Sequence, residues 1–353
     1  MMLILAFLVT MCLQDPETSP DLNSVHSATR VKGASLWLFP VEDGSEQVMF
    51  SSENTRDLLA GRADLRSLDV KWKKVAGMKD TGGLNIADHW HVFAHDHHWL
   101  SFSTGKARKS YLLKLDKNLQ RKGLWKVADG EEFASRKRGG RGPGGNREPS
   151  GMPTNDHFLV AEPEGVAVGH FYPGYGHRVF RFDIQGRLKE KVDVGDGKYR
   201  HGNGSSVIPL KSGYLILATE TLNPRAQGGI LFILTDADWK PLSIRRVIDE
   251  EGKNVAMASG IRLSDGYVIL AARVIPDASP RGERTQPPAG QKRQMKDDGA
   301  IVRYVISPGG KILSREVLLE KGGNRPHTVL KGDLLLTSWD GRGLWLRVDR
   351  ISR

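Results

Sequence analysis

The sequence predicts an all-β protein folded as a β-propeller of six blades, each made of four antiparallel strands. Three observations indicate this class: short apolar strands recur along the chain, turns rich in Asp and Gly separate them, and one four-strand pattern repeats. Residues 200–249 show the pattern most clearly, with expected strands at 205–209, 214–219, 229–234 and 242–248. A stretch of about fifty residues with four antiparallel strands has the size of one propeller blade.

The same pattern accounts for most of the remaining chain. Residues 89–127, 157–194 and 255–319 each hold four expected strands, while residues 325–351 hold only three. We therefore expect another part of the chain to supply the missing strand and close the ring, which also removes a sheet edge. Residues 25–75 are expected to begin a blade of their own. If they only add strands to the last blade, the ring has five blades; a β-sandwich or two all-β domains is the competing architecture.

The N-terminus reads as an export signal. Residues 1–20 form an apolar leader, with an uninterrupted apolar run to Cys12 that is shorter than the roughly twenty residues of a membrane span. We expect a secreted, periplasmic or cell-envelope protein with no transmembrane span in its mature form. A lipid anchor on Cys12 is a weaker alternative. Because Cys12 is the only cysteine, the single domain expected at 25–353 has no disulfide.

Charge and composition indicate the kind of partner. The chain carries 52 Lys and Arg against 41 Asp and Glu, a formal net charge of +11, which favours an anionic ligand. No helix-turn-helix, zinc-finger or RNA-binding signature accompanies this charge, so nucleic acid is not the expected partner. Two segments rich in Gly, Arg and Pro, at 131–151 and 276–299, are expected to be flexible basic insertions.

Three segments resemble a known repeat unit: GNGSSVIPLKSGYLILATE, ASGIRLSDGYVILAAR and RPHTVLKGDLLLTSW. Their order of Ser or Arg, strand, turn Gly and apolar strand resembles that of sialidase-like proteins with bacterial neuraminidase repeats, which are six-bladed propellers. The resemblance spans residues 156–339 and implies the same fold and, if activity is shared, glycoside hydrolysis. The hairpins at Asp236 and Ser307 stand where that family keeps its Asp-box, but neither matches S-x-D-x-G-x-x-W. The family's catalytic residues find no matching motif here.

Propeller topology predicts where a binding site would lie. The connections from the outer strand D to the next inner strand A, and from strand B to strand C, open on one face around the central channel, and such loops commonly carry binding groups. Arginine forks suit carboxylate, sulfate or phosphate. Together with the basic charge they indicate an anionic carbohydrate. The candidate substrate-binding residues on this face are His89, His157, Arg200, His201, Arg262, Arg273, Arg325, His327 and Asp340.

Hydrolysis of a glycosidic bond would need two carboxyl groups, for which Asp156 and Glu220 are the candidates, with Tyr175 near the anionic centre. The leading hypothesis is thus an exported propeller that binds, and in its stronger form hydrolyses, an anionic carbohydrate. A non-catalytic binding propeller of the cell envelope is one alternative. A lyase or hydrolase that holds a divalent metal on axial histidines is the other, although no local motif assigns a metal site. Histidines 95, 97 and 98 are expected in a polar A-to-B turn on the opposite face.

Overall fold

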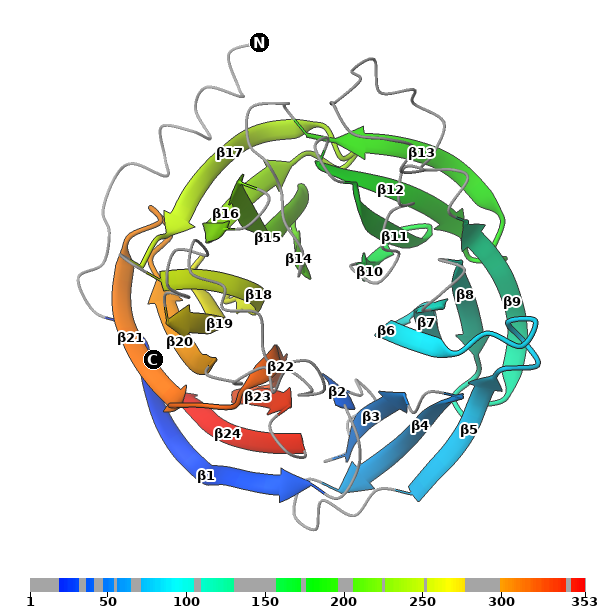
Figure 1. The fold of residues 1–353 in the computed structure, drawn as a ribbon, viewed down its shortest axis with the longest axis horizontal. Coiled ribbons are helices and arrows are strands. Elements are labelled where there is room, and N and C mark those ends of the chain that lie inside the picture. Colours follow the sequence, from blue (N-terminus) through cyan, green and yellow to red (C-terminus); the bar gives the residue numbers. More distant parts are fainter. Residues whose placement is uncertain are drawn as a thin grey trace, which may run out of the picture.

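The computed structural model describes residues 19–31, 36–40, 47–53, 56–64, 71–104, 109–129, 157–172, 176–195, 206–223, 226–250, 253–276, 299–340 and 344–352. Within these ranges the regular structure is all β, and the strands form six four-stranded sheets set around a central axis (Figure 1). The chain is therefore a β-propeller with six blades, as predicted, and the sandwich is excluded. No helix in the described ranges is long and apolar enough to cross a membrane.

Five blades are meanders of four consecutive antiparallel strands, each running from the channel outward. Blade 1 contains β2 (Leu36–Pro40), β3 (Gln47–Glu53), β4 (Asp57–Asp64) and β5 (Lys71–Gly77). Blade 2 contains β6 (Ile86–Ala94), β7 (His97–Thr104), β8 (Ser110–Leu115) and β9 (Arg121–Ala128). Blade 3 contains β10 (His157–Glu162), β11 (Gly165–Tyr172), β12 (Gly176–Asp183) and β13 (Leu188–Val194). Blade 4 contains β14 (Ser206–Leu210), β15 (Gly213–Asn223), β16 (Ala226–Thr235) and β17 (Pro241–Ile248). Blade 5 contains β18 (Lys253–Arg262), β19 (Val268–Pro276), β20 (Ala300–Ile306) and β21 (Ile312–Leu319).

The sixth blade closes the ring with strands from both ends of the chain. It contains β22 (Asn324–Lys331), β23 (Leu334–Asp340) and β24 (Leu344–Ser352), with β1 (Asp21–Val31) paired antiparallel to β24 as the outermost strand. The expected missing strand is thus confirmed. One detail was wrong: the segment beginning near residue 25 does not open a blade. It finishes the last one, because β1 hydrogen-bonds to an outer strand, and the first inner strand begins only at Leu36. The propeller also starts at Asp21, before the expected boundary at 25.

The hairpin between strands C and D explains the repeated Asp in the sequence. In blades 2, 3 and 4 the carboxylate of Asp116, Asp183 or Asp236 accepts backbone N–H groups two and four residues further on, at 2.8–3.0 Å. The residue three positions after each Asp is left-handed, which Gly186 adopts without strain at φ 81°. A short acceptor side chain at this position therefore sets the same turn in successive blades.

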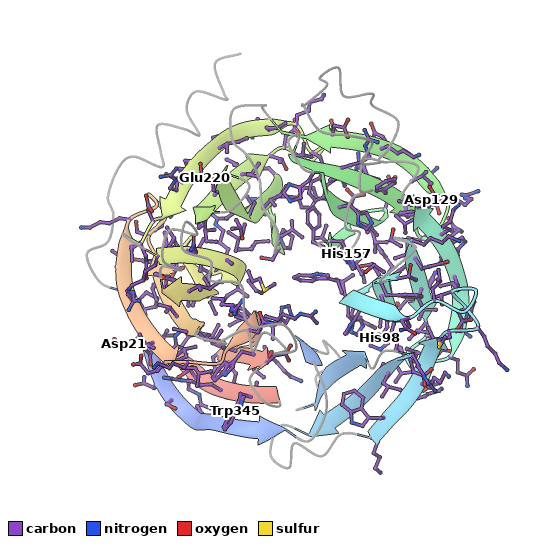
Figure 2. The ribbon with its side chains drawn as sticks, viewed as in Figure 1. Asp21, His98, Asp129, His157, Glu220 and Trp345 are labelled. Atoms are coloured by element: carbon purple, nitrogen blue, oxygen red, sulfur yellow. The ribbon has the colours of Figure 1, made fainter. Side chains whose placement is uncertain are left out.

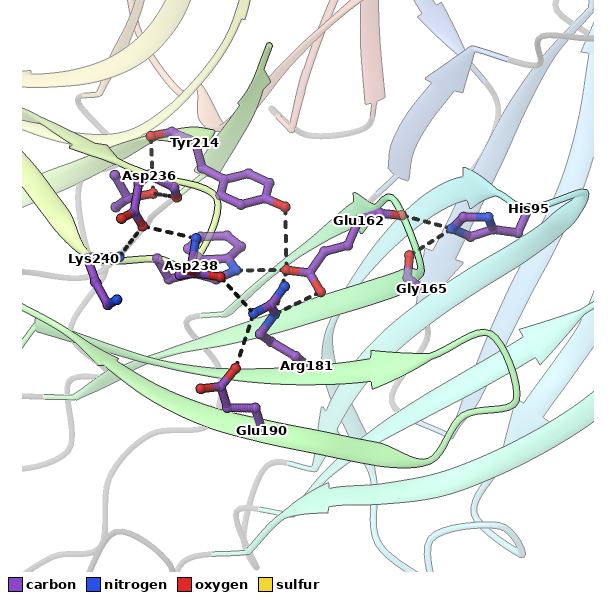
Figure 3. Close-up of polar contacts among 11 residues, drawn as sticks. His95, Glu162, Gly165, Arg181, Glu190, Tyr214, Asp236, Asp238 and Lys240 are labelled. Atoms are coloured by element: carbon purple, nitrogen blue, oxygen red, sulfur yellow. Dashed lines mark hydrogen bonds and ion pairs between the residues drawn. The ribbon is translucent and has the colours of Figure 1, made fainter. Parts of the chain in front are cut away.

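Neighbouring blades are joined by apolar packing and by a buried carboxylate. Trp239 of blade 4 is fully buried and stacks on Tyr214 at 3.9 Å between ring centroids. Glu162 of blade 3 accepts hydrogen bonds from Trp239 Nε1 at 2.8 Å and Tyr214 Oη at 3.4 Å, and pairs with Arg181 at 3.0 Å (Figure 3). Burial and the nearby Glu162 charge raise the pKa of Tyr214. This cluster around Glu162 lies at the A-to-B turn, at the end of β10, so we assign it to the packing of blade 3 against blade 4.

Candidate functional site

The strand pairings confirm which loops share a face of the ring. The D-to-A and B-to-C connections lie at one end of the strands, which we call the channel face; the A-to-B and C-to-D hairpins lie at the other. The segments that hold the two basic insertions join β9 to β10 and β19 to β20, so both connect strand ends on the channel face. Four predicted site residues lie outside the described residues: Asp156, Tyr175, Arg200 and His201.

Arg262 is a correction to the predicted site. It pairs with Val268 at the last step before the A-to-B hairpin, and its guanidinium lies close to Gly266 of that hairpin. Arg262 is thus on the face opposite the channel face. Its place at the end of an inner strand had suggested the site, but only residues at the beginning of an inner strand reach the channel face. Arg273, by contrast, pairs with Ala256 nearer the correct end.

Most of the buried histidines among the described residues lie in blades 2 and 3. Among the described residues, seven histidines are buried: His89, His91, His98, His157, His170, His177 and His327. His91 Nε2 lies 3.1 Å from His98 Nδ1, so one ring donates to the other. The prediction that His98 sits in the polar turn was wrong. The turn consists of His95 and Asp96 only, and His98 lies in the buried strand β7 (Figure 2).

Histidines from distant parts of the chain act on one another across the channel. Burial lowers the pKa of His91 well below its usual value, and the nearby His98, His89 and His327 lower it further. His327 belongs to blade 6, whereas the other three belong to blade 2. Its ring also lies 5.5 Å from the Trp90 ring in an edge-on arrangement. Residues 90 and 327 thus meet although a whole blade separates their strands in the ring.

Ser259 of blade 5 holds the His327 ring in place. The Thr328 N–H donates to Ser259 Oγ at 3.1 Å, and the Ser259 hydroxyl is also hydrogen-bonded to His327 Nδ1 at 3.2 Å. The inner strands of blades 5 and 6 therefore fix the position of the His327 ring next to Trp90.

Blade 3 contributes a second histidine group at the predicted site. His157 begins the inner strand β10, lies on the inner side of the ring in Figure 2, and has its ring 5.4 Å from that of its register partner His170. Burial, with smaller effects from His157 and His177, lowers the pKa of His170 well below its usual value. Burial thus favours the neutral form of the His170 ring, which lies beside His157.

The described histidines give no ready-made metal centre. No three His, Cys, Asp or Glu side chains in the described part of the chain are arranged to hold an ion. His91 and His98 bind each other, which occupies one nitrogen of each ring. The metal hypothesis also involved His201, which lies outside the described residues, and it stays a prediction.

Glu220 is buried but already engaged. Its carboxylate lies 2.5 Å from Arg246 Nε of strand D in the same blade, and Arg246 also contacts Asp249 at 3.0 Å. Figure 2 places Glu220 in blade 4, well apart from His157. Because the Glu220 carboxylate is already bound by Arg246, this geometry favours a structural ion pair over a catalytic role.

Replacing Glu220 with Gln is therefore expected to lower stability without affecting a ligand at the channel. Loss of the charged hydrogen bond to Arg246 should cost about 1–2 kcal/mol. Urea unfolding measures this cost, and glycan binding should stay within roughly twofold of the parent. Unchanged stability together with lost binding or turnover would restore Glu220 to the site.

The remaining predicted residues gather where blades 5 and 6 meet on the channel face. Gly323 donates its N–H to the Gly299 carbonyl at 2.9 Å, and the Arg273 side chain packs over Gly299. Asn324, next in the chain, is paired in register with Asp340. Arg325 follows in a left-handed conformation, φ 44°. Predicted residues 273, 325, 327 and 340 thus occupy one contiguous part of the ring.

Comparisons with known proteins support the fold. No protein-family model and no curated protein sequence matches the chain. Among solved structures, a protein of unknown function from Dyadobacter fermentans aligns at a TM-score of 0.59 and 10% identity, covering 95% of this chain and 100% of that one. A DUF4221 member from Bacteroides vulgatus aligns at 0.54 and 11%, covering 96% and 99%. An endo-arabinase from Bacteroides thetaiotaomicron gives 0.46 and 11%, covering 95% and 98%. At these identities the first two matches show the fold alone, and the sialidase resemblance stays a hypothesis.

Sequence reasoning missed two residues of this region. Trp90 stands between His89 and His91 in the sequence and belongs to the buried core, and its ring also contacts that of His327 in blade 6. The position of Trp90 between two histidines could have indicated that it lies close to the predicted site. The sequence around Met257 contains no such signal. Met257 stands out only in the structure, by its left-handed backbone conformation in β18.

Proposed function

We propose that this protein is an exported propeller that binds an acidic carbohydrate at the channel face. The observation that carries this proposal is the meeting of Trp90 and His327 at the channel, with Arg273 and Arg325 on the same face. An indole ring provides an apolar surface for sugar C–H groups, and imidazole nitrogens bind hydroxyls. Guanidinium forks bind carboxylate or sulfate. The net charge of +11 would draw a polyanion toward the protein.

Binding without turnover is the form we favour. A glycosidase of the expected type needs two carboxyl groups at a suitable separation. Of the two candidates, Glu220 is held by Arg246, and Asp156 lies outside the described residues. The proposal is therefore a binding propeller of the cell envelope or the extracellular medium.

A glycan array with uronic and sulfated polymers, probed at low and at physiological salt, tests the proposal. A specific ligand should remain bound at physiological salt, because attraction between exposed charges alone is largely screened beyond about 8 Å under those conditions. Failure to retain any acidic glycan at physiological salt would overturn the proposed function.

Calorimetry with the best array ligand then locates the site. Arg273→Ala is expected to weaken binding about tenfold, the effect of losing one charge-assisted contact. Arg262→Ala is the matched control, since it removes an arginine of the same blade from the opposite face. Equal loss in both variants would indicate diffuse electrostatic attraction and contradict a site on the channel face.

A further inference from the structure

Irregular backbone is concentrated in some of the inner strands. Register shifts interrupt β6 between Ile86 and Asp88, β18 between Ala256 and Ala258, and β22 between Asn324 and His327. The inner strands β10 and β14 pair with their neighbours without any shift. An inner strand of this ring can therefore form without a bulge. Because bulges redirect side chains and are typical next to binding sites, the three bulges indicate a local role in binding.

Two of the bulges hold non-glycine residues in the left-handed region. Met257 has φ 50° and Arg325 has φ 44°. This conformation is uncommon for residues with a Cβ and is concentrated at ligand sites, where surrounding contacts enforce it. Arg325 is further restricted because Pro326 follows it. Both strands lie side by side on the inner side of the ring (Figure 1).

Contacts from neighbouring blades keep both bulges in shape. The Met257 N–H donates to Thr219 Oγ1 of blade 4 at 3.3 Å. The bulge at Arg325 is bracketed by two contacts to blade 5, from Gly323 N–H to the Gly299 carbonyl and from Thr328 N–H to Ser259 Oγ. The Met257 bulge also lies in register with Arg273, which pairs with the adjacent Ala256. The strained residues are therefore held next to the groups that we assign to ligand binding.

We propose that the two left-handed bulges form a preorganised seat for a uronic-acid residue, in which Arg325 binds the carboxylate and Met257 contacts the apolar face of the sugar ring. This inference rests on the proposed function and deepens it. Arginine provides two parallel donors for a carboxylate, and a methionine thioether adapts to an apolar surface. Strain that is kept at two neighbouring positions is expected where function needs a fixed geometry, at the expense of stability.

Glycine substitutions distinguish the effect of backbone strain on stability from the effect of the side chain on binding. Glycine adopts the left-handed region freely, so Met257→Gly and Arg325→Gly should unfold at the same Tm as the parent or at a higher one, while binding weakens. Asp96→Gly is the matched control. Asp96 has φ 59°, is exposed, and lies in the A-to-B turn on the opposite face. It should also keep or raise the Tm but leave binding unchanged.

Polygalacturonate and its methyl ester are the probes, with affinity measured by calorimetry at physiological salt. The parent should prefer the free acid, and Arg325→Gly should lose that preference by about tenfold, because only the acid carries the charge. Met257→Gly should weaken both polymers by a similar factor, roughly threefold to fivefold.

The possible outcomes test the proposed uronic-acid seat separately from the proposed binding of an acidic carbohydrate. If the parent binds polygalacturonate and both glycine variants match it, the seat is wrong and the proposed function survives. If both glycine variants melt well below the parent while Asp96→Gly does not, the positions are not strained and the inference also fails. A parent that retains no acidic polymer at physiological salt overturns the proposed function, and the seat with it.

Discussion

Replacing Asp349 with Ala is expected to lower the free energy of unfolding by about 3–5 kcal/mol, because it removes a buried carboxylate that Arg303 and Arg347 share and leaves the buried Arg303 guanidinium with only the partly exposed Glu316 as a counter-charge. Asp349 is fully buried, and Arg303, only 2% exposed, contacts it at 2.5 Å. Arg303 belongs to blade 5 and Asp349 to the closing blade 6, so this pair joins the blade built from both chain ends to its neighbour. Urea unfolding followed by circular dichroism measures the loss.

An exposed ion pair in the same blade provides the control. Asp333 pairs with Arg350 at 2.9 Å, and both side chains are more than half exposed. Removing Asp333 should cost no more than about 1 kcal/mol, as is usual for surface pairs. The double variant Arg303→Met with Asp349→Leu should be clearly more stable than Asp349→Ala, since neither charge then remains buried. A loss below about 1 kcal/mol in Asp349→Ala would show that the pair is not desolvated as described.

The protein is expected to lose stability steeply as the pH falls below about 6.5, the usual pKa of histidine. His91 and His170 are buried, and burial lowers the pKa of each well below its ordinary value. In the unfolded chain both rings bind protons below about pH 6.5, whereas in the folded protein they stay neutral. The unfolded state is thus favoured by about 1.4 kcal/mol per pH unit for each ring, or about 2.7 kcal/mol for both.

Unfolding free energies at pH 7.5, 6.5 and 5.5 test this expectation. His91→Gln and His170→Gln should each reduce the dependence on pH below 6.5 by about one proton, even if each variant is less stable at pH 7.5. His97→Gln is the control, because His97 is the first residue of β7, next to the A-to-B turn, and is only half-buried. A stability that is flat between pH 6.5 and 5.5 would contradict neutral buried rings.

The local parts of the fold were readable from the sequence, because they depend on neighbouring residues. Alternating apolar residues identified the strands, and the Asp at each third hairpin identified turns that its own carboxylate stabilises. The count of three strands at the C-terminus correctly required a fourth from elsewhere, and β1 supplies it. The set of loops that share the channel face also followed from the meander order.

The position of individual side chains was decided by contacts between strands that are far apart in sequence. Arg262 and Arg273 look alike in the sequence, yet the register of β18 with β19 sends them to opposite ends. The sequence places Glu220 on a site loop, whereas the structure shows it bound by Arg246 of strand D. The sequence suggests that His98 belongs to a polar turn, whereas the structure places it inside the blade, hydrogen-bonded to His91.

The sequence by itself therefore determined the class of fold, the repeated unit of four strands and the face that carries the connections, since each follows from short-range pattern and from repetition. Only the tertiary structure decided that β1 belongs to the last blade, that Trp90 meets His327, and that Met257 and Arg325 are held in left-handed bulges. Those features depend on which strands become neighbours when the ring closes, and local spacing carries no information about that choice.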